Sequence, residues 1–252
     1  HARYRNLAGR SRHPHAFGEP FTLGNIEITL LPAGHMLGSA QVLLHHKVHR
    51  QTVLYSGDFA LQANGTCSPL AYPEVPVDLL ICESTFGLKG DHSDPEQSLR
   101  DLIEGTSLPL LIATYVLGKA QRMSALIKTV APEMPVLIHR NLMPYHRVYQ
   151  AHGIDLGEVI PYRRKFTKMA RRYAYLIPPP ALRSCTDDHR YHRVFASGWD
   201  QKKRYHFLEG RLDISDHASG PEIKAYIQRI QPKAVQFWHG YPEELIAWCG
   251  EV

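Results

Sequence analysis

Two patterns of apolar and polar residues recur along the chain, and both predict β-strands. Apolar and polar positions alternate at residues 26–30, and short apolar runs occur at 41–44, 52–55 and 77–82. The run at 77–82 is bounded by Pro76 and by a polar segment, as expected of a buried strand that ends in a loop. The opening third of the chain is therefore predicted to be rich in strands.

Beyond residue 94 the pattern changes to alternating strands and helices. Asp94 and Pro95 are suited to the cap and first position of a helix. Strands are predicted at 108–114, 134–138 and 234–238, and helices in the stretch from Gly118 to Val130, at 145–150 and at 220–230. Because strand followed by helix is typical of α/β proteins, this order predicts an α/β core with an inserted module.

Composition excludes some classes of protein and favours an anionic partner. The formal net charge is +5, from 29 Lys and Arg against 24 Asp and Glu, although many basic proteins bind nothing acidic. No apolar run approaches the roughly 18 residues that span a bilayer, and the first residues lack the apolar core of a signal peptide. We therefore expect a cytoplasmic enzyme without membrane contact.

The cysteines do not predict a disulfide framework or a zinc knuckle. Four cysteines lie far apart and form no Cys-x-x-Cys pair: Cys67, Cys82, Cys185 and Cys249. We interpret them as reduced and mostly buried thiols.

Candidate chemistry lies in loops that directly follow predicted strands. His35, Asp58, Glu83 and His239 each follow such a strand, and His217 precedes the helix at 220–230. Strand ends at one sheet edge can converge on a site, and imidazole and carboxylate groups are ligands for zinc. A single histidine in such a loop is more often structural, but the order of five together predicts a metal site in which Asp58 bridges two ions.

Six segments resemble, in order, the successive signatures of the β-CASP nucleases, a branch of the metallo-β-lactamase fold. They cover nearly the whole chain and are Ala33–Ala40, Ser56–Asp58, Glu83–Gly87, Leu117–Arg122, Ser215–Ala218 and His239–Gly240. The family includes RNA 3′-end processing nucleases and bacterial exonucleases associated with a DNA ligase. The motifs of this sequence resemble those of the exonucleases more closely. The resemblance implies an αββα sandwich core formed by residues 1–107 and 211–252, with a β-CASP α/β cap inserted at 108–210.

The resemblance also implies roles for the site residues. His35 would serve the first of two zinc ions, Asp58 would bridge both, and His239 would serve the second. His217 would protonate the leaving oxygen, and Glu83 would orient His217. For Glu83 the alternative is a strand-end carboxylate that caps a turn.

One departure from the family concerns its opening His-x-His-x-Asp-His segment, which does not occur in this sequence. We expect this segment to lie upstream of His1. The alternative is a natural fragment that binds metal poorly and does not cleave.

Basic residues in the expected cap are candidates for contact with nucleic acid. Arg163, Arg164 and Lys165 begin a basic run that could contact phosphates, and Lys119 and Arg122 follow a glycine at a helix start, a place suited to anions. The alternative for both groups is a solvated surface.

The resemblance implies a metal-dependent phosphodiesterase, foremost a DNA exonuclease in repair, with a DNA ligase or a helicase as a possible partner. An RNA 3′-end processing enzyme is the alternative, because the motifs contain the catalytic residues, whereas the cap determines whether DNA or RNA is bound. A catalytically inactive nucleic-acid-binding protein or scaffold is the alternative of another class.

Overall fold

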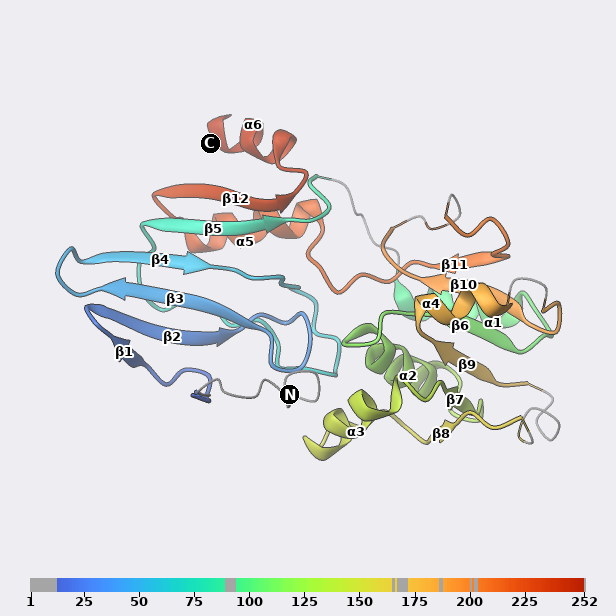
Figure 1. Ribbon diagram of the computed structural model, residues 1–252. Coiled ribbons are helices and arrows are strands. Elements are labelled where there is room, and N and C mark those ends of the chain that lie inside the picture. Colours follow the sequence, from blue (N-terminus) through green and yellow to red (C-terminus); the bar gives the residue numbers. More distant parts are fainter. Residues whose placement is uncertain are drawn as a thin grey trace. The chain divides into compact units, whose positions relative to one another are not determined.

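The computed structural model describes residues 13–88, 94–164, 166, 172–185, 188–199, 201 and 204–251. The chain divides into two compact units (Figure 1). The core unit contains the described residues up to 88 and those from 216 onwards, and the inserted unit contains those from 94 to 215. Among the described residues, no helix is long and apolar enough to cross a membrane.

The core unit is built on one six-stranded sheet in the order β1-β2-β3-β4-β5-β12 (Figure 1). Its strands are β1 (Phe21–Leu23), β2 (Ile26–Pro32), β3 (Ala40–His46), β4 (Gln51–Tyr55), β5 (Leu79–Ser84) and β12 (Ala234–Gly240). The first four strands pair antiparallel, whereas β4 with β5 and β5 with β12 pair parallel. As a consequence β2, β4, β5 and β12 run in the same direction, and their carboxyl ends lie at one edge of the sheet.

Two helices from the end of the chain complete the core unit. They are α5 (Gly220–Ile230) and α6 (Glu243–Glu251). Ser219 and Glu222 form a reciprocal capping box at the start of α5. Leu80 of β5 and Tyr226 of α5 are fully buried in one apolar cluster, so the segments before and after the inserted unit share a core.

The described residues of the core unit contain one sheet, whereas an αββα sandwich contains two. The α/β class predicted from the sequence agrees with the structure. The four-layer arrangement stays a prediction.

The inserted unit contains a second six-stranded sheet, in the order β11-β10-β6-β9-β7-β8, and every pair in it is parallel. Its strands are β6 (Leu110–Ala113), β7 (Val136–Ile138), β8 (Val159–Pro161), β9 (Ala174–Ile177), β10 (His192–Ala196) and β11 (Gly210–Leu212). Its helices are α1 (Pro95–Glu104), α2 (Lys119–Val130), α3 (Met143–Ala151) and α4 (Pro179–Leu182), followed by a 3₁₀ turn at Arg183–Cys185. Every residue of β6 and β9 is buried, as expected for parallel strands covered on both faces.

The inserted unit extends beyond the segment 108–210 and includes α1. This helix packs on α2 and β11, and Leu99 of α1 lies in the same apolar cluster as Met123 and Ile127 of α2. The helix α1 thus belongs to the inserted unit because its apolar side packs against α2 and β11 of that unit.

A histidine without a role in the predicted chemistry is fully buried in the inserted unit. His146 of α3 contacts the side-chain amide of Gln121 through Nδ1 (3.1 Å) and the Ser124 hydroxyl through Nε2 (3.0 Å). Burial lowers the pKa of His146 below its ordinary value of 6.5, although a hydrogen bond to the Leu142 carbonyl opposes this effect. The folded protein therefore favours the neutral imidazole.

This burial predicts that acid destabilises the protein through His146. As the pH falls below about 6.5, the unfolded chain takes up a proton that the folded chain binds only at lower pH, so stability decreases by up to about 1.4 kcal/mol per pH unit. The urea midpoint should fall between about pH 7.5 and pH 5, and His146→Gln should reduce that fall. The exposed His152 is the control, since His152→Gln should keep the wild-type fall. An unchanged fall in His146→Gln would contradict the prediction.

Candidate metal and catalytic site

The loops at the carboxyl edge of the core sheet are joined by backbone hydrogen bonds. The Ala60 amide, after β4, donates to the Ala33 carbonyl after β2 (3.1 Å). The Ala218 amide, before α5, donates to the Phe59 carbonyl (2.7 Å). These bonds hold together three loops that are far apart in the sequence.

The structure brings three of the predicted site residues together. His35, Asp58 and His217 each offer one ligand atom, and these atoms all lie within 4.8 Å of one another. Nε2 of His35 lies 3.9 Å from Oδ2 of Asp58. Bonds from zinc to nitrogen and oxygen are each about 2.0 to 2.2 Å long, so two bonds to a common ion can span this separation. The donor set therefore fits a metal ion.

His35 is held in the orientation that ligation requires. Its Nδ1 lies 2.8 Å from the Asp216 carbonyl oxygen, so Nδ1 carries the hydrogen in this contact and Nε2 is left as the ligand atom. Metal-bound histidines commonly donate their other ring nitrogen in this way. Gly34 makes the preceding turn with a φ of +75°, and a Cβ at this position would clash with the Ala60 carbonyl. Glycine is therefore required directly before His35.

Asp58 lies in a loop that is tied to β5. The hydroxyl of Ser56 accepts a hydrogen bond from the Glu83 amide (3.1 Å), and the Ser56 amide donates to the Ile81 carbonyl (2.9 Å). The side chain of Asp58 is 51% exposed. Its carboxylate is thus accessible from solvent while its backbone is held by the neighbouring strand.

Glu83 and His217 form a hydrogen-bonded pair beside these ligands. Oε2 of Glu83 lies 3.0 Å from Nδ1 of His217. Glu83 is 3% exposed, and its carboxylate also accepts from the Phe59 amide (2.6 Å) and the Thr85 hydroxyl. A buried carboxylate with three donors is well stabilised. It holds the His217 ring with Nε2 as the remaining nitrogen.

His217 also lies next to the His35 ring, with 4.7 Å between the ring centroids. This position makes His217 both a partner of Glu83 and a member of the metal-competent group. The resemblance implied a protonating role for His217, although the sequence also placed it among the five residues that predict a metal site. Its position beside the His35 ring is not visible in any local sequence pattern.

His239 lies at the same edge but outside the group of three. It has a φ of +68°, and its carbonyl accepts a hydrogen bond from the Ser84 hydroxyl. Gly240 follows with a φ of +91°, and a Cβ there would clash with the Ser84 backbone. His239 and Gly240 both belong to β12, and the register of its pairing with β5 shifts between Trp238 and Gly240, so His239 lies within the strand and not after it. Metal ligation by His239 stays a prediction.

Two of the predicted nucleic-acid contacts are bound to the protein backbone. Lys119 is 5% exposed, and its Nζ donates to the Ile214 carbonyl (2.9 Å). The Arg122 guanidinium donates to the Ser215 carbonyl. These contacts hold the segment that precedes His217 in the sequence, and the burial of Lys119 excludes the alternative that this residue lies on a solvated surface. Contact of either residue with nucleic acid stays a prediction.

Arg163 and Arg164 are exposed, as a phosphate contact requires. Lys165 lies outside the described residues, as does much of the basic run that it belongs to. The contact of this run with nucleic acid stays a prediction.

Some groups of the site have no signal in the sequence. The Asp216 carbonyl and the Phe59 amide are backbone groups, which every residue carries. Thr85 and Ser56 lie inside the recognised motifs, but their hydroxyl contacts with Glu83 depend on the fold. The motifs therefore identified the segments that form the site, whereas the hydrogen bonds that support its side chains are visible only in the structure.

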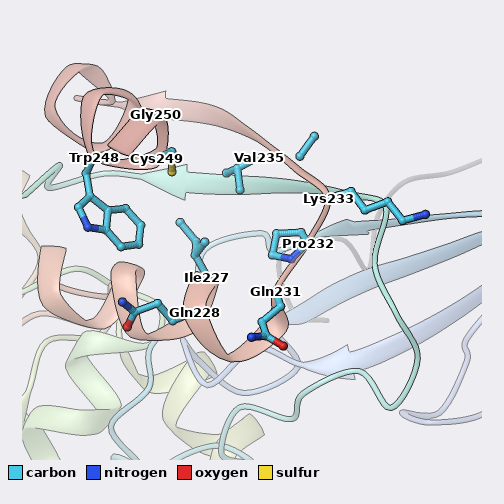
Figure 2. Close-up of a pocket in the computed structure, with 10 residues that line it drawn as sticks. Ile227, Gln228, Gln231, Pro232, Lys233, Val235, Trp248, Cys249 and Gly250 are labelled. Carbon is cyan, nitrogen blue, oxygen red and sulfur yellow. The ribbon is translucent and has the colours of Figure 1, made fainter. Parts of the chain in front are cut away.

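A separate cavity lies away from these residues. It has a volume of about 670 Å³ between α5, β12 and α6, and Figure 2 shows Trp248 and Ile227 among its lining side chains. None of the predicted site residues lines it. The candidate chemistry therefore belongs to the strand ends and not to this cavity.

Comparison with known proteins identifies several relatives, although no protein-family model matches the chain. A probable DNA ligase of Opitutus terrae is 30% identical over 251 residues, which are 94% of this chain and 24% of that protein. An RNase J-like protein of Methanocaldococcus jannaschii is 29% identical over 140 residues, 51% of this chain and 33% of that protein. The endoribonuclease ysh1 of Emericella nidulans is 30% identical over 118 residues, 44% of this chain and 13% of that protein. The chain thus spans a third or less of these relatives.

The fold also resembles a solved structure. A protein of unknown function from Enterococcus faecalis V583 matches 92% of this chain and 62% of its own, with a TM-score of 0.61 and 13% identity. At this identity the match supports the fold alone. The relatives and the order of the motifs together confirm the resemblance: this chain is related to the β-CASP nucleases of the metallo-β-lactamase fold.

Proposed function

We propose that this chain is part of a metal-dependent phosphodiesterase that acts on nucleic acid, foremost a DNA exonuclease in repair. The observation that carries the proposal is the placement of His35 and Asp58 beside the Glu83–His217 pair. Two potential ligands next to a histidine oriented by a buried carboxylate are the groups that phosphodiester hydrolysis requires. The relative named as a DNA ligase, which matches almost the whole chain, favours DNA and a ligase as partner.

The proposed metal is zinc, with two ions in the full-length enzyme inside a four-layer αββα core. His35 would hold the first ion, Asp58 would bridge both, and His239 would hold the second. When bound, such ions polarise the phosphoryl group and supply a nucleophile at neutral pH.

The chain's own residues would then orient the substrate and move a proton. The Asp216 carbonyl keeps Nε2 of His35 turned toward Asp58. Nδ1–H of His217 donates a hydrogen bond to Glu83, and in the imidazolium form Nε2–H of His217 would deliver its proton to the departing oxygen, which leaves the neutral imidazole. Arg163 and Arg164 would add contacts with the phosphate backbone, whose strength depends on salt.

A second candidate function is RNA processing. Two of the relatives carry the names endoribonuclease ysh1 and RNase J-like protein. The catalytic groups would be the same, and recognition of a 2′-hydroxyl would distinguish the substrate.

The experiment that tests the proposal compares the substrates directly. The full-length protein should cleave labelled DNA, lose this activity on treatment with a chelator and regain it with zinc. Cleavage of RNA in place of DNA would establish the second function. Binding of nucleic acid without cleavage, in protein that contains stoichiometric zinc, would refute the enzymatic proposal and support a scaffold.

A further inference from the structure

A second cavity lies in the inserted unit at the carboxyl ends of its parallel strands. It has a volume of about 330 Å³. Tyr115 follows β6, the prolines of α4 follow β9, and Phe195 belongs to β10, so three adjacent strands contribute to its wall. In open α/β sheets, ligands bind outside the carboxyl ends of the strands where the chain connections diverge.

The connections of this sheet diverge at the cavity. From β6 the chain passes through α2 to β7 on one side, and from β10 it passes to β11 on the other. The strands β6 and β10 are neighbours in the sheet. The cavity thus occupies the position at which this architecture forms a crevice.

Three aromatic rings line the cavity. Phe195 and Tyr205 are buried and stacked, with 5.7 Å between the ring centroids. Tyr115 meets Phe195 edge to face at 5.9 Å, and the Lys119 ammonium lies 5.6 Å from its ring centroid. Although it has both contacts, Tyr115 is 43% exposed. Its ring is therefore held in place and still accessible to a flat ligand.

The charged residues at the cavity are cationic. Arg183 and Arg204 are both exposed and line it, and the Arg204 guanidinium lies 5.5 Å from the centroid of the Tyr205 ring. None of the described residues that line the cavity is acidic. Arginine is the side chain best suited to bind phosphate.

We infer that this cavity binds one nucleotide of a single-stranded nucleic acid. The base stacks on Tyr115, and the adjoining phosphate is held by Arg183 and Arg204. A volume near the lower end of the range for ligand pockets suits one nucleotide unit. The inference rests on the proposed function for the identity of the polymer, and it adds a recognition site that is separate from the metal-competent group.

Binding and catalysis can be tested separately. The full-length protein is titrated with a fluorescently labelled single-stranded oligonucleotide in the presence of a chelator, and fluorescence anisotropy reports the Kd without cleavage. Tyr115→Ala should weaken binding by roughly 5- to 100-fold, the range expected for one lost stacking contact. Tyr115→Phe keeps the ring and should bind as the wild-type protein does. Since Tyr115 is partly exposed, its truncation leaves no large buried void.

Salt dependence tests the phosphate contact. Arg204→Ala should lower the slope of log K against log salt by about 0.7, the value for one phosphate contact on a single strand. Arg140→Ala removes an exposed arginine of the same unit that does not line the cavity, and it should keep the slope. Equal effects of these two variants, or wild-type binding by Tyr115→Ala, would overturn the inference.

Two further outcomes separate this inference from the proposed function and from a free ligand. Weakened binding by the cavity variants of a protein that cleaves nothing would support the cavity while refuting the nuclease. Cleavage by a protein whose cavity variants bind normally would support the nuclease and refute the cavity as a binding site. If adenosine monophosphate binds as tightly as the oligonucleotide, the cavity serves a free nucleotide and the inference is overturned.

Discussion

Asp58→Ala is expected to remove metal binding and phosphodiester cleavage together. The proposed role of Asp58 is to bridge two ions, so its loss takes one ligand from each. His35 alone cannot replace it, because its Nε2 faces the Asp58 carboxylate at 3.9 Å and the group of three has no other carboxylate. The zinc content of the full-length protein, measured by mass spectrometry of the metal, and the cleavage rate should both fall to background.

The half-exposed Asp58 side chain makes this variant informative, since truncation at an exposed position leaves the fold intact. Glu27→Ala, near the start of β2 and thus at the opposite end of this strand from the loop of His35, removes a partly exposed carboxylate and should keep both metal and activity. Normal turnover by Asp58→Ala with bound metal would exclude the bridging role.

His217→Ala is expected to lower kcat by about 10²- to 10⁴-fold, the usual contribution of a general acid, while the zinc content is retained. The KM should change little, because the proton is transferred only as the leaving oxygen departs. A phosphodiester with a p-nitrophenyl leaving group needs no such proton, so the loss of kcat with this substrate should be much smaller.

Glu83→Gln provides the matched comparison for His217. It keeps the size of the side chain but removes the charge that faces Nδ1 of His217. We expect a smaller loss of about 10- to 100-fold, as for other groups that orient a functional histidine. Loss of zinc from His217→Ala would instead identify His217 as a ligand, an assignment for which its proximity to His35 provides the structural basis.

Much of the local structure is predictable from the sequence for identifiable reasons. The alternation at residues 26–30 corresponds to β2, and the apolar run at 77–82 overlaps β5, because both patterns are typical of β-strands. Pro95 occupies the first turn of α1, behind the predicted Asp94 cap. The motifs also include Gly34, whose positive φ makes the sharp turn before His35, because glycine is favoured where the chain must turn in this way.

The environment of a side chain was less predictable. Lys119 was predicted to contact nucleic acid, with a solvated surface as the alternative, yet it is buried and bound to the Ile214 carbonyl. Polarity in the sequence does not tell whether an ammonium group meets water or a backbone carbonyl that approaches from a distant segment. The grouping of α1 with the inserted unit has the same origin, because it depends on which apolar surface the helix finds.

The sequence by itself determined the α/β class, the strand ends that carry polar residues and the relationship to the β-CASP nucleases, because local periodicity and short motifs encode these features. Only the tertiary structure decided which side chains meet. The Glu83–His217 hydrogen bond spans 134 positions and the His35–Asp216 contact spans 181. Contacts of this range depend on strand order and loop pairing, which are set by burial across the whole core unit and not by any segment alone.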